Sequence, residues 1–369
     1  MSTRPPNSSS GPFDHLAMRY LRQALDTAHP TDEPYVLNRT EHRIIRRAKI
    51  TTLLMAALVG VLGVLLLYWP QYSWPHLFAS TSVTILGTVY SLPLTTILYG
   101  LLLVYIEVNM LIMLNLRGVK AIMKACQFPR AHDPQYETHL RALADAALQR
   151  SSRGLLRFGI DPYLTMPRWG LTIYFLLNLA KAALGSLVLK FLLRRFLGRF
   201  AFRQVTDLAG MPVYALWNAW SSWRVLHEAQ IRVIAPATIQ EFVNELYDEW
   251  KNDPQFQRLI LEALQYAAIM KRQYNYAHHL LVEKLIERFN LETTQTLTGH
   301  FVEQFVQAPA DVRHGLERLL IFGVLIDGRL SWAEKQKLRR LRRSGFLTYS
   351  SDDVARLGQE YNEGKGLWV

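Results

Sequence analysis

The residues best suited to chemistry in this 369-residue chain are two acids on either side of a turn, Asp327 and Glu334. Carboxylates at this spacing match the second half of an EF-hand calcium loop, which runs from a central glycine, here Gly328, to a final glutamate. The first-half ligand positions would fall on Gly323 and Leu325, whose side chains cannot bind calcium. A metal site at Asp327 and Glu334 is therefore one hypothesis.

The same turn also fits a purely structural role. Ser331 precedes Glu334 by three positions, which is the spacing of a capping box, in which each side chain accepts a backbone N–H of the first helical turn. Gly328 permits a left-handed backbone at the end of the preceding helix. Structural capping and metal binding both remain open from the sequence.

Other catalytic or metal-binding patterns are weak. His279 and Glu283 share a helix face at i, i+4, but no third metal ligand is indicated, and Glu283 also fits a solvated charged face. We find no phosphate-binding glycine loop, no nucleophile with its base and acid, no HExxH motif and no cysteine pair, since Cys126 is the only cysteine. The sequence predicts no enzyme activity and no cofactor.

Polar side chains inside apolar stretches form a second group of candidates. They are Glu107, Asn109, Asn178 and Lys181, and in an oligomer they could line a pore. The sequence allows two positions for Glu107 relative to the membrane. A membrane span at residues 83–103 leaves it at the cytoplasmic interface, whereas a later span buries it in the bilayer.

The elements that would position these groups are membrane helices. Residues 50–69 are apolar and uncharged, and they are long enough for the roughly 30 Å hydrocarbon layer. Basic residues stand directly before them, which predicts a cytoplasmic N-terminus: Arg39, Arg43, Arg46, Arg47 and Lys49. Further apolar segments at 83–116, 169–193 and 208–223 predict about four spans, with both termini in the cytoplasm.

The third and fourth segments are joined by a basic stretch. Its arginines are Arg194, Arg195, Arg199 and Arg203. Two full crossings would place them outside, against the positive-inside rule. In that case the arginines would hold anionic lipid or a partner subunit. Alternatively, residues 169–223 form a hairpin that enters from the cytoplasm and lies partly in the inner leaflet.

Helical periodicity dominates the remainder of the chain. We predict an all-α protein with a disordered tail at 1–12, an amphipathic and basic segment at 13–49, membrane pairs at 50–116 and 169–233, a cytosolic linker at 117–168 and a cytosolic bundle at 234–369. The predicted bundle helices are 236–251, 254–270, 277–290, 292–307, 310–326, 331–345 and 350–362. A short amphipathic helix is expected near 13–27, packed on the cytosolic domain or a neighbour, or lying on the bilayer.

Two segments resemble known families. Residues 197–230, with Gly210, Pro212 and Asn218, resemble the membrane hairpin of bacterial proteins of the EcsC and YcjF-like type, which would imply an anchor without catalytic activity. Residues 316–341, with Asp327, Gly328 and Ser331, resemble the TerB-like domain, an all-helical module named from bacterial tellurite resistance. Residues 259–291 have the same helix-turn-helix shape, but their turn, starting at Lys271, lacks the Asp-Gly pair.

Composition agrees with a membrane protein that carries a soluble part. Mean hydropathy is only +0.03 although half of the residues are hydrophobic. The net charge of +12 is interpreted as a topology signal and an attraction to anionic headgroups, not as a nucleic-acid site. Residues 335–343 carry six cations, as a solvated face or as a surface for headgroups.

Together these features predict a non-enzymatic, multi-pass protein of the bacterial inner membrane. Its TerB-like domain would recruit an unidentified cytosolic protein or sense envelope stress, and the chain would form a homo-oligomer. The alternative is a homo-oligomeric channel or transporter built around the polar membrane residues.

Overall fold

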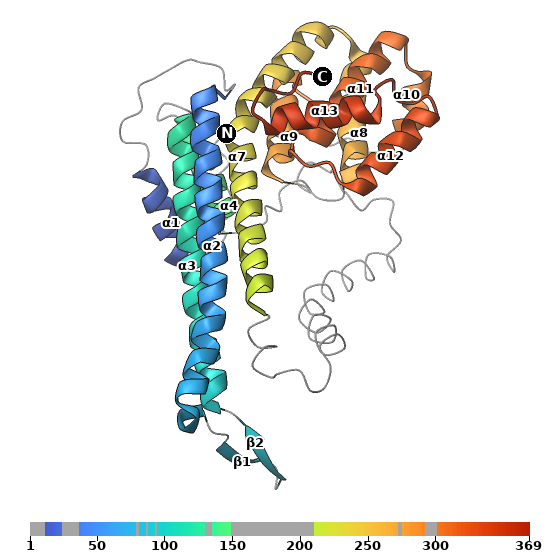
Figure 1. The fold of residues 1–369 in the computed structure, drawn as a ribbon. Coiled ribbons are helices and arrows are strands. Elements are labelled where there is room, and N and C mark those ends of the chain that lie inside the picture. Colours follow the sequence, from blue (N-terminus) through green and yellow to red (C-terminus); the bar gives the residue numbers. More distant parts are fainter. Residues whose placement is uncertain are drawn as a thin grey trace. The chain divides into compact units, whose positions relative to one another are not determined.

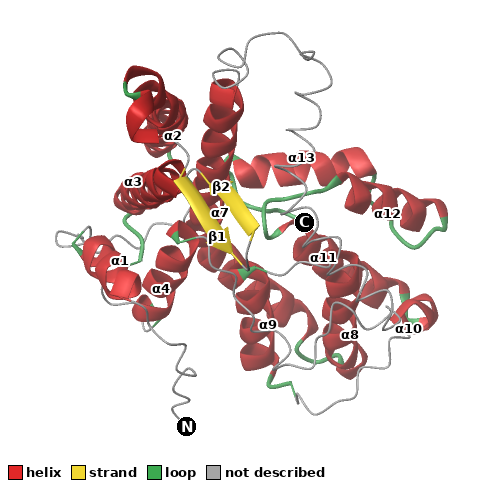
Figure 2. Cartoon of the chain, turned by 90° about the horizontal axis from the view of Figure 1, so that it is seen from below, coloured by secondary structure: helices red, strands yellow, loops and turns green. Residues whose placement is uncertain are grey.

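The computed structural model describes residues 12–23, 37–78, 81–85, 88–92, 94–129, 135–148, 210–271, 275–291 and 301–369. The elements are α1 (Pro12–Arg22), α2 (Arg39–Ser73), η1 (Pro75–Phe78), β1 (Thr81–Ile85), β2 (Thr88–Leu92), α3 (Leu94–Cys126), α4 (Tyr136–Ala147), α7 (Gly210–Trp250), α8 (Pro254–Lys271), α9 (Tyr276–Phe289), α10 (Phe301–Gln307), α11 (Ala310–Leu325), α12 (Trp332–Arg343) and α13 (Ser351–Asn362). Figure 2 shows that helices dominate these residues, so the all-α class is confirmed at this level.

The chain divides into two compact units. The bundle unit comprises Met1–Ile45, Ile122–Leu171 and His227–Val369, and the apolar unit comprises Arg46–Ala121 and Thr172–Leu226. The bundle unit is thus assembled from segments that the apolar unit interrupts along the chain. We describe each unit separately.

The apolar unit contains two helices that are long and apolar enough to cross a membrane, α2 and the Leu98–Cys126 part of α3. Figure 1 shows these two helices side by side. Only 28% of the most apolar stretch of α2 is buried, and only 6% of the most apolar stretch of α3 is buried. The core helix of a water-soluble protein would be mostly buried, so these helices expose apolar side chains that water solvates poorly.

A short hairpin joins α2 to α3 and corrects the second predicted membrane segment. The apolar region 83–116 was expected to form a membrane helix, with a kink allowed at Pro93 and Gly100. Instead β1 and β2 pair antiparallel, with Thr81 opposite Leu92 and Ile85 opposite Thr88, and the helix begins only at Leu94. The many β-branched residues before Pro93 favour strands, and the helix then extends past residue 116 to Cys126.

The fourth predicted span and the first bundle helix are one continuous helix, α7, which is long enough to cross a membrane but not apolar enough. Pro236 was expected to start a helix but lies inside one. Ile234, Ala235 and Ile239 around it are almost completely buried, so tertiary packing overrides the local preference of proline. The predicted third span, at 169–193, lies outside the described residues.

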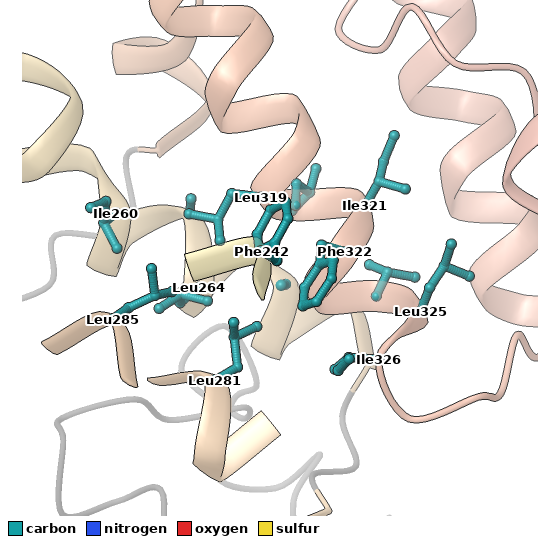
Figure 3. Close-up of a cluster of buried hydrophobic side chains, with 14 of the residues drawn as sticks. Phe242, Ile260, Leu264, Leu281, Leu285, Leu319, Ile321, Phe322, Leu325 and Ile326 are labelled. Atoms are coloured by element: carbon teal, nitrogen blue, oxygen red, sulfur yellow. The ribbon is translucent and has the colours of Figure 1, made fainter. Parts of the chain in front are cut away.

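The bundle unit has one large hydrophobic core, drawn from α7, α8, α9 and α11 and shown in Figure 3. Phe242 of α7 and Phe322 of α11 stack with ring centroids 3.8 Å apart. Around this pair lie leucines and isoleucines of the neighbouring helices, including Leu264 and Leu281. Helices α8, α9, α11, α12 and α13 agree with the sequence prediction to within two residues at each end, whereas α10 is described only from Phe301.

The predicted linker contributes to the bundle unit. Its α4 packs against α1, where Ala17 and Leu21 are buried and the side chains of Arg22 and Glu137 form an ion pair of 2.6 Å. Helix α1 therefore packs on another helix of the bundle unit. The backbone N–H of Leu37 donates to the carbonyl oxygen of Gly364 at 2.9 Å.

Candidate functional site

The predicted acids Asp327 and Glu334 converge on the side chain of Lys271, which lies at the end of α8. The Lys271 ammonium is 2.7 Å from Asp327 Oδ1 and 3.5 Å from Glu334 Oε2, and it donates to the carbonyl oxygen of Arg329 at 2.6 Å. The side chain of Lys271 is only 2% exposed. We call these four residues the Lys271 cluster.

The turn between α11 and α12 holds both acids in place. Ser331 and Glu334 form the predicted capping box, with the N–H of Ser331 donating to Glu334 Oε2 at 2.7 Å. Asp327 Oδ1 also accepts the N–H of Arg329 at 2.9 Å. Gly328 has a φ of +66°, and a Cβ there would lie 2.5 Å from Ile231 Cδ1, so both backbone conformation and space require glycine.

In the Lys271 cluster an ammonium group lies where the metal hypothesis would put a cation. Two carboxylates and one carbonyl oxygen face it, which is the all-oxygen environment that hard cations prefer. Burial raises the pKa of the Asp327 carboxyl, and the Lys271 charge opposes this effect. No group of three or more metal-binding side chains occurs within the part of the chain that the structure describes.

Sequence reasoning missed Lys271 as a functional candidate. The upstream helix-turn-helix, at residues 259–291, has no acid in its turn. In fact, the residue that opens this turn carries the opposite charge and reaches the acids of the other copy. A lysine at a helix end opposite an unpaired Asp-Gly turn is the signal that could have identified the pair.

His278, in the first turn of α9, lies in the same interior. Its Nε2 is 3.0 Å from the carbonyl oxygen of Gly323, and its Nδ1 accepts the N–H of Asn275 in a second capping box. Burial, and next the Lys271 charge, lower the pKa of His278 to about 3, against the hydrogen bond to Gly323. His278 is therefore a neutral structural residue at pH 7. Its neighbour His279 lies 3.7 Å from Glu283, as the i, i+4 spacing predicts.

Comparison with protein-family models, with curated proteins and with solved structures finds no match. The TerB-like and EcsC-like resemblances therefore remain predictions, based on the residues that carry them.

The apolar unit brings together two polar residues from helices far apart in the sequence. The Asn218 amide of α7 donates to Glu107 Oε1 of α3 at 2.6 Å, and Asn218 is buried. A Cβ at Gly63 of α2 would lie 3.4 Å from Glu107 Oε2. Because Gly63 is well inside the apolar run 50–69, the carboxylate lies at the depth of that run and not at its end.

The other predicted membrane residues do not join this contact. The Asn109 amide donates to the carbonyl oxygen of Tyr105 in its own helix at 2.7 Å. Asn178, Lys181 and the four arginines Arg194, Arg195, Arg199 and Arg203 lie outside the described residues. The contact itself depends on close helix packing, since a Cβ at Gly60 would be 2.8 Å from the backbone of Tyr214 in α7.

Proposed function

We propose that the chain is a non-enzymatic, multi-pass protein of the bacterial inner membrane, in which α2 and α3 cross the bilayer. Its cytosolic TerB-like bundle recruits a protein partner or senses envelope stress. The observation that carries this proposal is the exposure of apolar side chains along α2 and α3, for which lipid is the matching solvent. The large core of the bundle unit supports a folded soluble part.

The closed Lys271 cluster supports recruitment through the bundle surface. Its two acids are already neutralised by a group of the same chain, so they are not free to bind a charged substrate. A module of this kind acts through the side chains that it presents on its exterior.

The first test is membrane integration of the full chain. We expect it to stay in the membrane fraction after washing at pH 11, and tags at both ends to be accessible only from the cytoplasmic side. Release by alkaline washing, or tags accessible from the periplasm, would contradict the proposal.

The second test is partner recruitment. Cross-linking of the full chain should recover one defined cytosolic protein. The matched control is a chain that ends at residue 233 and keeps the apolar segments. Equal recovery with both chains would contradict recruitment by the bundle.

The second candidate function is an ion channel or transporter, and the Glu107–Asn218 contact favours it. In liposomes containing the purified chain, Glu107→Gln should change ion flux several-fold, because it removes a charge but keeps a hydrogen-bonding side chain of the same size. Lys181→Met is the second informative variant. Gln71→Leu is the control, since Gln71 is not a predicted pore residue and its amide donates to the carbonyl oxygen of Leu67 within its own helix. Liposomes that stay silent across voltages and ions would rule this function out.

A further inference from the structure

Helix α12 presents two opposite faces. Glu334 and Leu338 are buried, and Leu341 packs against the core of the bundle unit. At 100° per residue, Trp332, Arg339 and Arg343 lie on the opposite side of the helix. Trp332 is 75% exposed, the largest exposed fraction among the exposed large hydrophobic residues of the described chain.

The outer face of α12 is strongly basic and weakly paired. Arg339, Arg340, Arg342 and Arg343 are all exposed. Among the described residues, Arg340 and Arg343 have no side-chain hydrogen bond or ion pair, and Arg339 makes only a 3.5 Å contact with Ser351 Oγ. The single acid of the helix, Glu334, is buried in the Lys271 cluster. The positive charge of this face is therefore available to a partner.

We propose that the outer face of α12, formed by Trp332, Arg339, Arg340 and Arg343, docks on an anionic membrane surface. Arginines attract acidic headgroups, and tryptophan has a strong preference for the boundary between headgroups and acyl chains. An exposed tryptophan beside arginines distinguishes this face from a merely solvated one. The inference rests on the proposed membrane attachment, which keeps the bundle close to a bilayer and raises its effective concentration there.

The experiment uses the full chain in nanodiscs. Cys126, the only cysteine, is buried and is replaced by serine, and Gln336→Cys on the outer face carries a fluorescent label. Lipids with brominated acyl chains quench a label that reaches the bilayer. We expect quenching in discs that contain about one-third phosphatidylglycerol, little in neutral phosphatidylcholine discs, and loss of quenching in high salt.

The decisive variant is Arg339→Gln/Arg340→Gln/Arg343→Gln. Each lost arginine should weaken docking by about fivefold, so the triple variant should weaken it by about a hundredfold. The control is Lys251→Gln/Arg258→Gln/Arg313→Gln, which removes the same charge from exposed positions outside α12 and should keep the quenching. Circular dichroism verifies that both variants are folded.

The outcomes separate the two proposals. If the chain is integrated in the discs but the label stays unquenched, docking by α12 is wrong and the proposed membrane attachment stands. Failure of the chain to integrate at all would instead overturn the proposed function. Equal quenching in neutral and anionic discs, or equal loss in the two triple variants, would overturn the role of the α12 arginines. Binding of a labelled RNA that depends on these arginines, without lipid quenching, would assign the face to nucleic acid.

Discussion

Replacing Lys271 with methionine should destabilise the bundle unit by about 3–5 kcal/mol, because the variant leaves two buried carboxylates without their counter-charge. Asp327 and Glu334 lie 2.7 and 3.5 Å from the ammonium, and the rest of their surroundings is largely closed to water. Urea titration of the chain in detergent, followed by far-ultraviolet circular dichroism, measures the loss. The signal reports on the bundle unit, because helices held in a micelle resist urea better than a bundle in water does.

Lys284→Met is the matched control for this experiment. Lys284 pairs with Glu287 at 3.0 Å on the same bundle, but Glu287 is two-thirds exposed. Such surface pairs contribute at most about 1 kcal/mol. An equal loss in the two variants would show that the Lys271 cluster is not a buried ion pair in solution.

A second variant tests whether the ammonium takes the place of a metal ion. Lys271→Ala leaves space between the two carboxylates and the Arg329 carbonyl oxygen, which are ligands of the kind that Ca²⁺ prefers. Millimolar Ca²⁺ should therefore restore part of the stability of Lys271→Ala and leave that of the unmodified chain unchanged. Stabilisation of both chains by the same amount would contradict this interpretation.

Acid should destabilise the bundle unit through His278. In the folded chain the pKa of His278 is about 3, whereas an exposed histidine titrates near 6.5. Because the folded pKa is the lower one, the contribution is fully present above pH 6.5 and is lost as pH falls toward 3. The slope is about 1.4 kcal/mol per pH unit, and the complete loss is about 5 kcal/mol.

The variant His278→Gln isolates this contribution, because glutamine can still donate to Gly323 but does not titrate. The measured quantity is the difference in unfolding free energy between the two chains as a function of pH. It should be constant above about pH 7 and should shift in favour of the variant below pH 6. A difference that stays constant down to pH 4 would show that His278 is not held neutral by the fold.

The sequence predicted most of the helices because their signals are local. Asp327-Gly328, the Ser331–Glu334 box and the spacing of apolar residues mark the boundaries of α11 and α12 without reference to the rest of the chain. The two exposed apolar helices were also predicted, since length and hydropathy suffice.

What the sequence could not supply depends on contacts between distant segments. Pro236 looks like a helix start until its buried neighbours are seen, and the hairpin before Leu94 competes with an apolar run that also suits a helix. Lys271 and Asp327, like Glu107 and Asn218, come together only through tertiary packing. The spacing of apolar residues identifies the buried face of a helix, but it does not identify the residues that this face contacts.

The hydrogen bond from Leu37 to Gly364 has a consequence for biosynthesis. Leu37 leaves the ribosome long before Gly364 does, and both apolar helices are made in between. The segment around Leu37 is therefore made before its hydrogen-bond partner exists. The fold of the bundle unit can close only when the residues around Gly364 have emerged, so this unit matures after translation of the apolar unit is complete.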